Sequence, residues 1–143
     1  MNDFIKEAHS GLRWLVLVLL LVSIVMGFLS ASQNKPYKKG LYAATMGFLH
    51  IQVILGIILL VQNKLSVFDT MSFGEVMKNA GLRADIVEHP TMMLLAAIVA
   101  TVGYSSGKRA ATDAQKHKKT AIFYSIALVL IFLGIQRITG TFY

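Results

Sequence analysis

Four histidines are the residues of this chain with the clearest capacity for chemistry. His9 and His89 each stand at the start of an apolar segment, whereas His50 lies well inside another such segment and His117 lies in a basic stretch. Neutral imidazole is a common metal ligand, and a haem iron accepts one imidazole on each of its two faces. Two histidines that face each other across a helical bundle would therefore hold one haem.

The composition is that of an integral membrane protein, because 55% of the 143 residues are hydrophobic and only 15% are charged. A helix needs about 20 mainly apolar residues to cross the hydrocarbon core. Four segments approach this length, with approximate bounds of 12–31, 41–61, 90–106 and 120–138. The third is long enough only if His89 stands at the membrane edge. We therefore expect an all-α protein with one domain over 1–143, an integral membrane four-helix bundle with up-down-up-down topology.

The net charge of +7 is concentrated in two short connections, which hold eight of the fourteen lysines and arginines: Lys35, Lys38, Lys39, Lys108, Arg109, Lys116, Lys118 and Lys119. The longer connection, 62–88, has balanced charge. The positive-inside rule then places the basic connections in the cytoplasm, and both termini and the loop 62–88 outward, in a bacterial inner membrane. Attraction to anionic lipid explains the basic residues. A lipid bilayer is thus the expected partner, and nucleic acid is not.

The first and third helices of such a bundle run in the same direction, so His9 and His89 are expected at the same depth near the outer face. A faint internal repeat supports their pairing. In each half a histidine precedes the first helix, and Leu55-Gly56-Ile57 in the second helix recurs as Leu133-Gly134-Ile135 in the fourth. Two hairpins related by an axis along the membrane normal would bring the histidines together. The alternative is that each is an ordinary interfacial histidine.

Two arginines are candidates to bind the propionates of a haem. Arg13 follows His9 by one helical turn and shares its face. Arg137 stands at the outward end of the fourth segment, at about the same depth. The alternatives for Arg137 are an ion pair with Glu7 or Glu88, or extension to the interface.

His50 lies roughly 13 Å along its predicted helix, at 1.5 Å per residue, and therefore near mid-membrane. An ionisable residue at that depth is functional by default. We expect it to relay protons, to hydrogen-bond a quinone or to bind a cofactor in another arrangement. The alternative is an interhelical hydrogen bond to Thr45, Gln52 or Tyr124. His117, in a cytoplasmic basic turn, is expected to be solvated.

The outward connection is expected to contain a short amphipathic helix between the second and third membrane helices. From Ser72 onward the apolar residues follow helical spacing: Phe73, Val76, Met77 and Ala80. Ser72 and Glu75 have the spacing of a capping box, and Gly81 is expected to end the helix. Such a helix would lie on the outer surface, either as a gate or as a simple cover over the bundle.

Short motifs in this chain resemble one half of haem A synthase. They are His9-Ser10-Gly11-Leu12-Arg13-Trp14, Gln52-Val53-Ile54-Leu55-Gly56, and Glu88-His89-Pro90 before an apolar helix. That family consists of two similar four-helix bundles, each with a histidine pair near the outer face, whereas this chain has one bundle. The chain is also similar to small four-helix bacterial membrane proteins identified as cytochrome b. The resemblance implies that His9 and His89 are the axial ligands.

These inferences predict a membrane cytochrome that holds one haem b between His9 and His89 and transfers electrons within a larger respiratory assembly. Its expected partners are other membrane subunits, with a quinone as a further candidate. The absence of cysteine excludes thiolate ligation, iron–sulfur clusters and disulfides. Two alternatives stay open, namely a haem-handling or haem-modifying membrane enzyme and an accessory structural subunit without a metal. An electron-transfer subunit is favoured over a stand-alone enzyme.

Overall fold

The computed structural model of the protein describes residues 2–139, and no strand occurs among them. The elements in chain order are α1 (Asn2–Ser32), α2 (Gly40–Asn63), the 3₁₀ helix η1 (Leu65–Asp69), α3 (Phe73–Lys78), α4 (Ala80–Arg83), the π-helix η2 (Ala84–Glu88), α5 (His89–Lys108) and α6 (Asp113–Thr139). Within this described part, four helical stretches are long and apolar enough to cross a membrane: Asp3–Ser32, Gly40–Asp69, Ala80–Lys108 and Asp113–Arg137. The predicted all-helical class is confirmed, with four helices suited to a multi-pass membrane protein.

The observed helices are longer than the apolar segments expected from the sequence. α1 begins at Asn2, so His9 lies on regular helix rather than before it. α5 begins at His89, and α4 and η2 continue its helical path back to Ala80. Hydropathy detects the part of a helix that faces hydrocarbon, whereas helical hydrogen bonding continues into the polar region beyond it. The short third segment is therefore part of a helix of ordinary membrane-spanning length.

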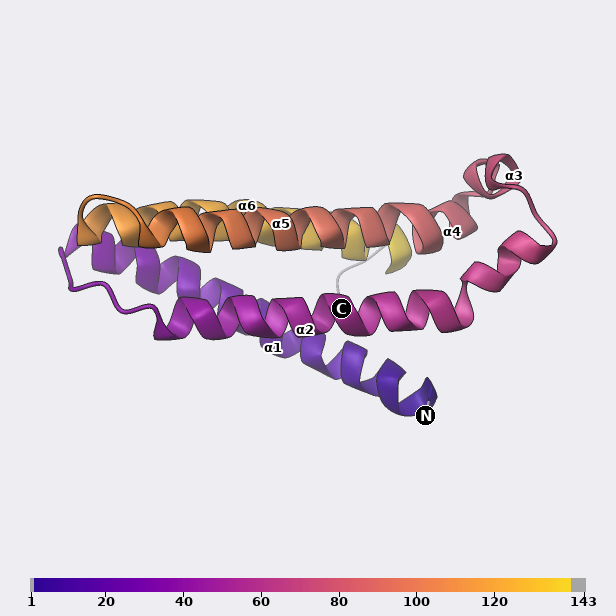
Figure 1. Ribbon diagram of the computed structural model, residues 1–143, viewed down its shortest axis with the longest axis horizontal. Coiled ribbons are helices and arrows are strands. Elements are labelled where there is room, and N and C mark those ends of the chain that lie inside the picture. Colours follow the sequence, from indigo (N-terminus) through magenta and orange to yellow (C-terminus); the bar gives the residue numbers. More distant parts are fainter. Residues whose placement is uncertain (1, 140–143) are drawn as a thin grey trace.

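The four long helices lie side by side, and the chain turns back at both ends of the molecule (Figure 1). The α1–α2 and α5–α6 turns lie at one end, and η1, α3 and α4 lie at the other. α1 and α5 each pack against both α2 and α6. At its amino-terminal end α1 diverges from the other three long helices (Figure 1). Met1 and residues 140–143, which include the chain ends expected to face outward, lie outside the described residues.

α5 and α6 approach each other closely at glycines. A Cβ atom added at Gly103 would overlap the Phe123 side chain, and one added at Gly107 would overlap the Thr120 hydroxyl. Small residues allow such close backbone contact between membrane helices. This packing fixes the rotation of α5 about its own axis, and with it the direction in which His89 points.

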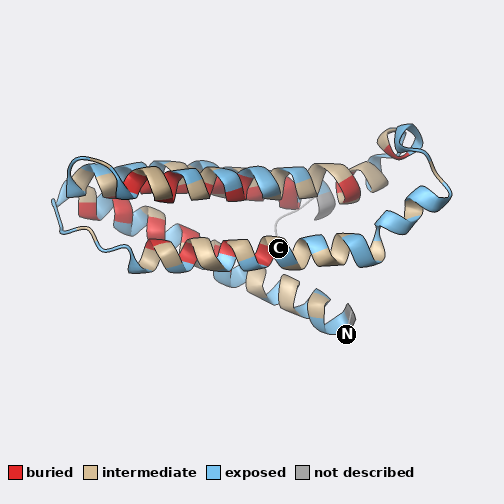
Figure 2. Ribbon diagram, in the orientation of Figure 1, coloured by how far each residue is buried: buried red, intermediate tan, exposed pale blue. Residues whose placement is uncertain are grey.

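The buried side chains form an inward-facing band along the bundle, while the outer faces are exposed (Figure 2). The core includes Val16, Leu20, Leu49, Ala96, Ala100, Tyr124, Ala127 and Ile131. Large apolar side chains are also exposed along every long helix, among them Leu21, Ile54, Ile98 and Val129. A soluble monomer rarely exposes so continuous an apolar surface, so this surface fits a lipid environment.

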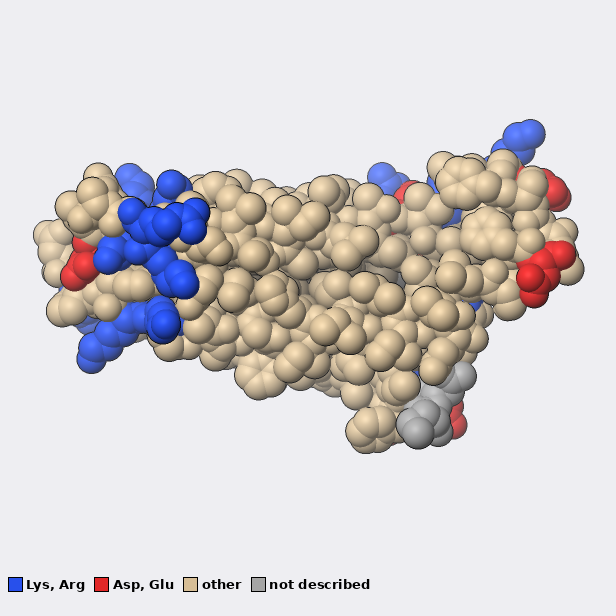
Figure 3. All heavy atoms as spheres, viewed as in Figure 1, with Lys and Arg blue, Asp and Glu red and all other residues tan. Residues whose placement is uncertain are grey.

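Lysine and arginine side chains gather at the end that carries the α1–α2 and α5–α6 turns (Figure 3). Acidic side chains stand out at the opposite end, on the side seen in this view. The charge asymmetry expected from the sequence is therefore present in three dimensions. We call these the basic end and the opposite end.

The connection at the opposite end contains the capping box predicted at Ser72. The Ser72 hydroxyl accepts a hydrogen bond from the Glu75 amide at 3.2 Å, and the Glu75 carboxylate accepts one from the Ser72 amide at 3.1 Å. The helix that follows ends at Lys78 rather than at Gly81, because Asn79 caps a new helix, α4, through the Leu82 amide.

Candidate functional site

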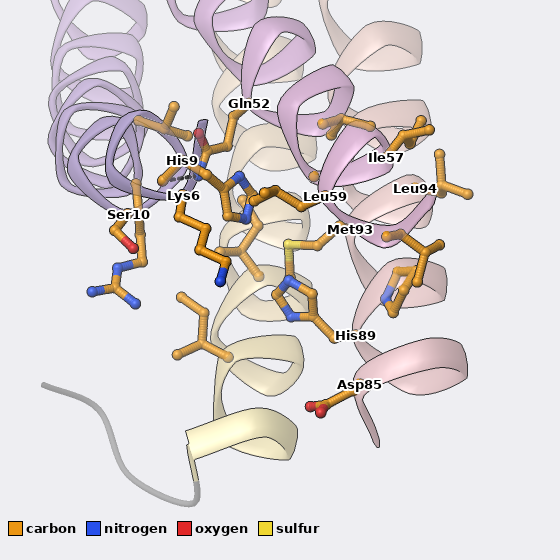
Figure 4. A pocket seen from close by; sticks show the side chains of 18 of the residues that line it. Lys6, His9, Ser10, Gln52, Ile57, Leu59, Asp85, His89, Met93 and Leu94 are labelled. Carbon is orange, nitrogen blue, oxygen red and sulfur yellow. Dashed lines mark hydrogen bonds between the residues drawn. The ribbon is translucent and has the colours of Figure 1, made fainter. Parts of the chain in front are cut away.

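A cavity of about 500 Å³ lies among α1, α2, η2, α5 and α6, towards the opposite end of the bundle (Figure 4). This volume is within the range of sites that hold a cofactor or a drug-sized ligand. Apolar side chains form most of its wall, including Val16, Leu17, Leu49, Leu60, Met93, Leu94 and Ile131. A smaller set of polar and charged side chains interrupts that wall: Lys6, His9, Ser10, Arg13, Gln52, Asn63, Lys64, Asp85 and His89.

His9 reaches the cavity from α1. Its ring lies against Gly56 of α2, where an added Cβ would stand 3.2 Å from the Cε1 atom of His9. The Gln52 side-chain amide donates a hydrogen bond of 2.7 Å to the His9 main-chain carbonyl. The Nδ1 atom of His9 is buried and has no hydrogen-bond partner among the described residues. The main chain at His9 is thus anchored, while its imidazole remains available to a ligand.

His89 reaches the same cavity from the first residue of α5. The π-helix η2 leads directly into α5, and the His89 amide donates to the Ala84 carbonyl, so Pro90 stands within a continuous helical stretch just after a π-helical turn. The Nδ1 atom of His89 lies 3.1 Å from the Gly134 carbonyl oxygen of α6. Because a carbonyl only accepts, Nδ1 carries the proton and donates it, so Nε2 keeps its lone pair for a ligand.

Each cavity histidine lies against the glycine of its own half of the chain. His9 contacts Gly56 in the first half, and His89 contacts Gly134 in the second half through both the carbonyl bond and the glycine's open side. These glycines are the central residues of the repeated Leu-Gly-Ile motif. Each repeated Leu-Gly-Ile motif therefore lies beside one of the two histidines that reach the cavity, as the histidine labels in Figure 4 indicate.

Three buried polar atoms that line this cavity lack a hydrogen-bond partner. They are His9 Nδ1, Arg13 Nε and Gln52 Oε1, and only Tyr37 Oη shares this property elsewhere in the described part of the chain. Buried polar groups are nearly always hydrogen-bonded in folded proteins. Their concentration around one cavity indicates that a ligand completes the site.

The basic side chains of the cavity differ in the contacts that they make. Lys64 makes an ion pair of 3.4 Å with Asp85, which joins the end of α2 to η2. Arg13 lies 4.9 Å from the Trp14 ring centroid, while its Nε atom stays unpartnered. Lys6 also lines the cavity, one helical turn before His9 and Ser10 on α1 (Figure 4). Lys6 and Lys64 were not expected from the sequence, because neither stands beside a motif.

Arg137 and His50, both expected at the site, are not among the residues that line the cavity. Arg137 is exposed near the end of α6. His50 lies on α2, where its Nε2 atom makes a 2.8 Å hydrogen bond with the Thr101 hydroxyl of α5. Thr101 in turn donates to the Ala97 carbonyl. This interhelical bond matches the structural alternative for His50, although the partner differs from the three that were considered.

The prediction that His117 is solvated is wrong, because only 4% of its surface is exposed. Its Nδ1 atom lies 2.6 Å from the Tyr42 hydroxyl, and its Nε2 atom lies 3.2 Å and 3.3 Å from the main-chain carbonyls of Lys35 and Pro36. The amino-terminal part of α6 therefore packs against the α1–α2 connection through His117. Burial there, with the phenols of Tyr104 and Tyr42, raises the pKa of Tyr37 to about 12.

The described residues contain no group of three or more histidine, cysteine, aspartate or glutamate side chains placed to hold a metal ion. A non-haem metal centre built from protein ligands therefore has no candidate in this part of the chain. Haem ligation makes a smaller demand, since the macrocycle supplies four nitrogens and the protein supplies two axial ligands. His9 and His89 meet that demand in number and type.

Comparisons with known proteins identify no relative that could specify the cavity's ligand. No protein-family model, no curated protein and no solved structure matches the chain. The chemistry of the cavity therefore has to be inferred from its own residues and from the short motifs described above.

Proposed function

We propose that this protein is a membrane-embedded b-type cytochrome that binds one haem between His9 and His89. The observation that carries this proposal is one largely apolar cavity that receives both imidazoles and whose lining residues include three with unsatisfied polar atoms. A flat, mainly apolar ligand with two axial coordination sites and two carboxylates matches that cavity. The assignment of haem b as the cofactor follows from this chemistry and from the absence of cysteine.

The residues present fit a haem in three respects. His9 and His89 would supply the axial nitrogens, and the absence of a side chain at Gly56 makes room for the His9 ring. Arg13, with its unpartnered Nε, and Lys6 would meet the propionate carboxylates. Charge-assisted hydrogen bonds between such groups are among the strongest in proteins.

The chain's own residues would hold and insulate the cofactor. The Gly134 carbonyl fixes the tautomer and orientation of His89, and such a bond raises the basicity of a ligating imidazole. Leu49, Met93 and Ile131 keep water from the cavity wall. A bound haem supplies one-electron transfer. Because both axial positions would be filled by protein, electron transfer is favoured over a stand-alone enzymatic activity.

The proposed placement is an up-down-up-down bundle in a bacterial inner membrane with the basic end in the cytoplasm. The location of most basic side chains at one end supports it (Figure 3). The cavity then lies near the outer face. At the same end α3 packs against α4, with Val76 fully buried and Phe73 exposed. A partner subunit or a quinol would exchange electrons from that side, within a larger respiratory assembly.

A reduced-minus-oxidised absorption spectrum of the purified protein tests this proposal. We expect the bands of a low-spin b-type haem in wild type, and their loss or conversion to high spin in His9→Ala and His89→Ala. His50→Gln, which keeps a hydrogen-bonding group for Thr101 outside the cavity, should retain the wild-type spectrum. Monodisperse elution in detergent must accompany every spectrum.

The alternatives give different results in the same experiment. Well-folded wild-type protein that lacks haem, even after expression with excess haem, would contradict the proposal and favour an accessory structural subunit. Extraction of a chemically altered haem would instead favour a haem-modifying enzyme. Haem bands that survive loss of both His9 and His89 would contradict the assignment of the ligands.

A further inference from the structure

The two cavity histidines are held in different ways, although the sequence repeat makes them equivalent. His89 Nδ1 donates to the Gly134 carbonyl at 3.1 Å, so its ring is tied to α6. His9 Nδ1 has no hydrogen-bond partner in the described part of the chain, so no bond at that atom holds its ring. The hydrogen bond near His9 runs instead from Gln52 to the His9 main-chain carbonyl.

This difference has a consequence for ligand strength. A second hydrogen bond on an imidazole holds the ring in its coordinating orientation and increases its basicity. His89 receives both effects, and its ring cannot turn without breaking the bond to Gly134. His9 receives neither from a described residue, and the bond from Gln52 holds its main chain rather than its ring.

The helices that carry the two histidines also pack differently. Each ring lies near a glycine, Gly56 for His9 and Gly134 for His89, so this contact does not distinguish the two histidines. However, α1 diverges from the other long helices at the end that carries His9 (Figure 1), whereas α5 packs extensively on α6.

We propose that His89 is the retained axial ligand and His9 the exchangeable one, so that a small neutral diatomic molecule binds the ferrous haem on the His9 side. This inference rests on the proposed function. In the exchange, the bond between iron and the His9 imidazole breaks and a bond between iron and the incoming ligand forms. No electron is transferred, and the displaced imidazole keeps its lone pair.

Carbon monoxide is the probe for this exchange, added to the reduced, haem-loaded full-length protein. We expect wild type to convert from a six-coordinate low-spin spectrum to a carbon monoxide complex. His9→Ala should keep most of its haem, bind carbon monoxide without the slow displacement step, and give the same final spectrum as wild type. His89→Ala should lose most of its haem. Gly47→Ala, where an added Cβ meets nothing within 4 Å, is the control for folding and haem loading.

The outcomes separate this inference from the proposed function. Haem-loaded wild type that shows no carbon monoxide complex, while His9→Ala forms one, overturns the exchange and leaves the bis-histidine haem intact. Greater haem loss from His9→Ala than from His89→Ala reverses the order of the ligands and overturns it too. Folded wild type without haem overturns both proposals.

Discussion

The ring of His9 lies against Gly56 and that of His89 near Gly134, but only at Gly56 does the space for the imidazole depend directly on the absence of a methyl group. At Gly56 the nearest atom to an added Cβ is Cε1 of His9, at 3.2 Å. At Gly134 the same addition meets Met93 and Met92 before it meets His89. A substitution at Gly56 therefore acts on the histidine directly, whereas one at Gly134 acts first on the packing between α5 and α6.

Gly56→Ala should disturb the haem site without unfolding the protein. The His9 ring must shift by a few tenths of an ångström, while alanine improves helix propensity by about 0.8–1 kcal/mol over glycine. We expect a lower haem-to-protein ratio or a partly high-spin spectrum, with an unchanged or higher melting temperature. Gly47→Ala on the same helix is the matched control. Equal spectra for the two variants would show that Gly56 has no role at the site.

Arg13 and Arg137 can be compared directly, because one lines the cavity and the other is exposed. A hydrogen bond to a charged group contributes about 1.5–3 kcal/mol, so Arg13→Ala should speed haem loss by roughly tenfold or more. The measurement is the rate of haem transfer to a haem-scavenging protein in detergent. Arg137→Ala should leave this rate near that of wild type. A larger effect at Arg137 would instead favour it as the propionate partner.

At the scale of whole elements, a buried polar cluster joins the α1–α2 connection to α6. His117 on α6 bonds to the Tyr42 hydroxyl and to carbonyls of the connection, and Tyr124 donates a 2.7 Å bond to the Tyr42 carbonyl. The cluster fixes how the first hairpin sits on the second. It lies at the basic end, away from the cavity, and so contributes to the site only by holding the helices that form it.

His117→Ala should destabilise the bundle. It leaves the buried Tyr42 hydroxyl without its partner, which costs about 1–3 kcal/mol, and it removes the bonds to the main-chain carbonyls of Lys35 and Pro36. We expect a clearly lower melting temperature in detergent, with an unchanged haem spectrum in the protein that stays folded. Lys118→Ala, at the exposed neighbouring residue, should melt like wild type. If His117→Ala also melted like wild type, the cluster would have no role in holding α6 to the α1–α2 connection.

At the scale of the molecule, the separation of charge between the two ends predicts how the chain sits in a membrane (Figure 3). The chain contains no cysteine, so single introduced cysteines report on their own positions. Lys78 in α3 and Lys118 in α6 are exposed residues of the same type at opposite ends, which makes them a matched pair.

Lys78→Cys should react with a membrane-impermeant maleimide in intact spheroplasts. Lys118→Cys should react only after the membrane is opened, because its end of the bundle is expected in the cytoplasm. The readout is the mass shift of the purified protein before and after permeabilisation. The reverse labelling pattern would place the haem cavity near the cytoplasmic face and contradict the proposed orientation.

The sequence by itself determined the four apolar helices, the basic character of two connections, the capping box at Ser72 and the presence of His9 and His89 on the first and third of those helices. These are local properties, since they depend on hydropathy, charge and spacing within a few turns of one helix. The sequence repeat also supported the pairing of His9 with His89, but it did not indicate that Gly56 and Gly134 would each lie beside a histidine.

Only the tertiary structure decided which side chains meet. The burial of His117, the pairing of His50 with Thr101 and the cavity positions of Lys6, Gln52 and Lys64 depend on the rotation and tilt of each helix. Those are set by contacts between residues far apart in the chain, such as Gly103 with Phe123. For the same reason the unequal hydrogen bonding of His9 and His89 was not visible in a sequence that presents them as equivalent.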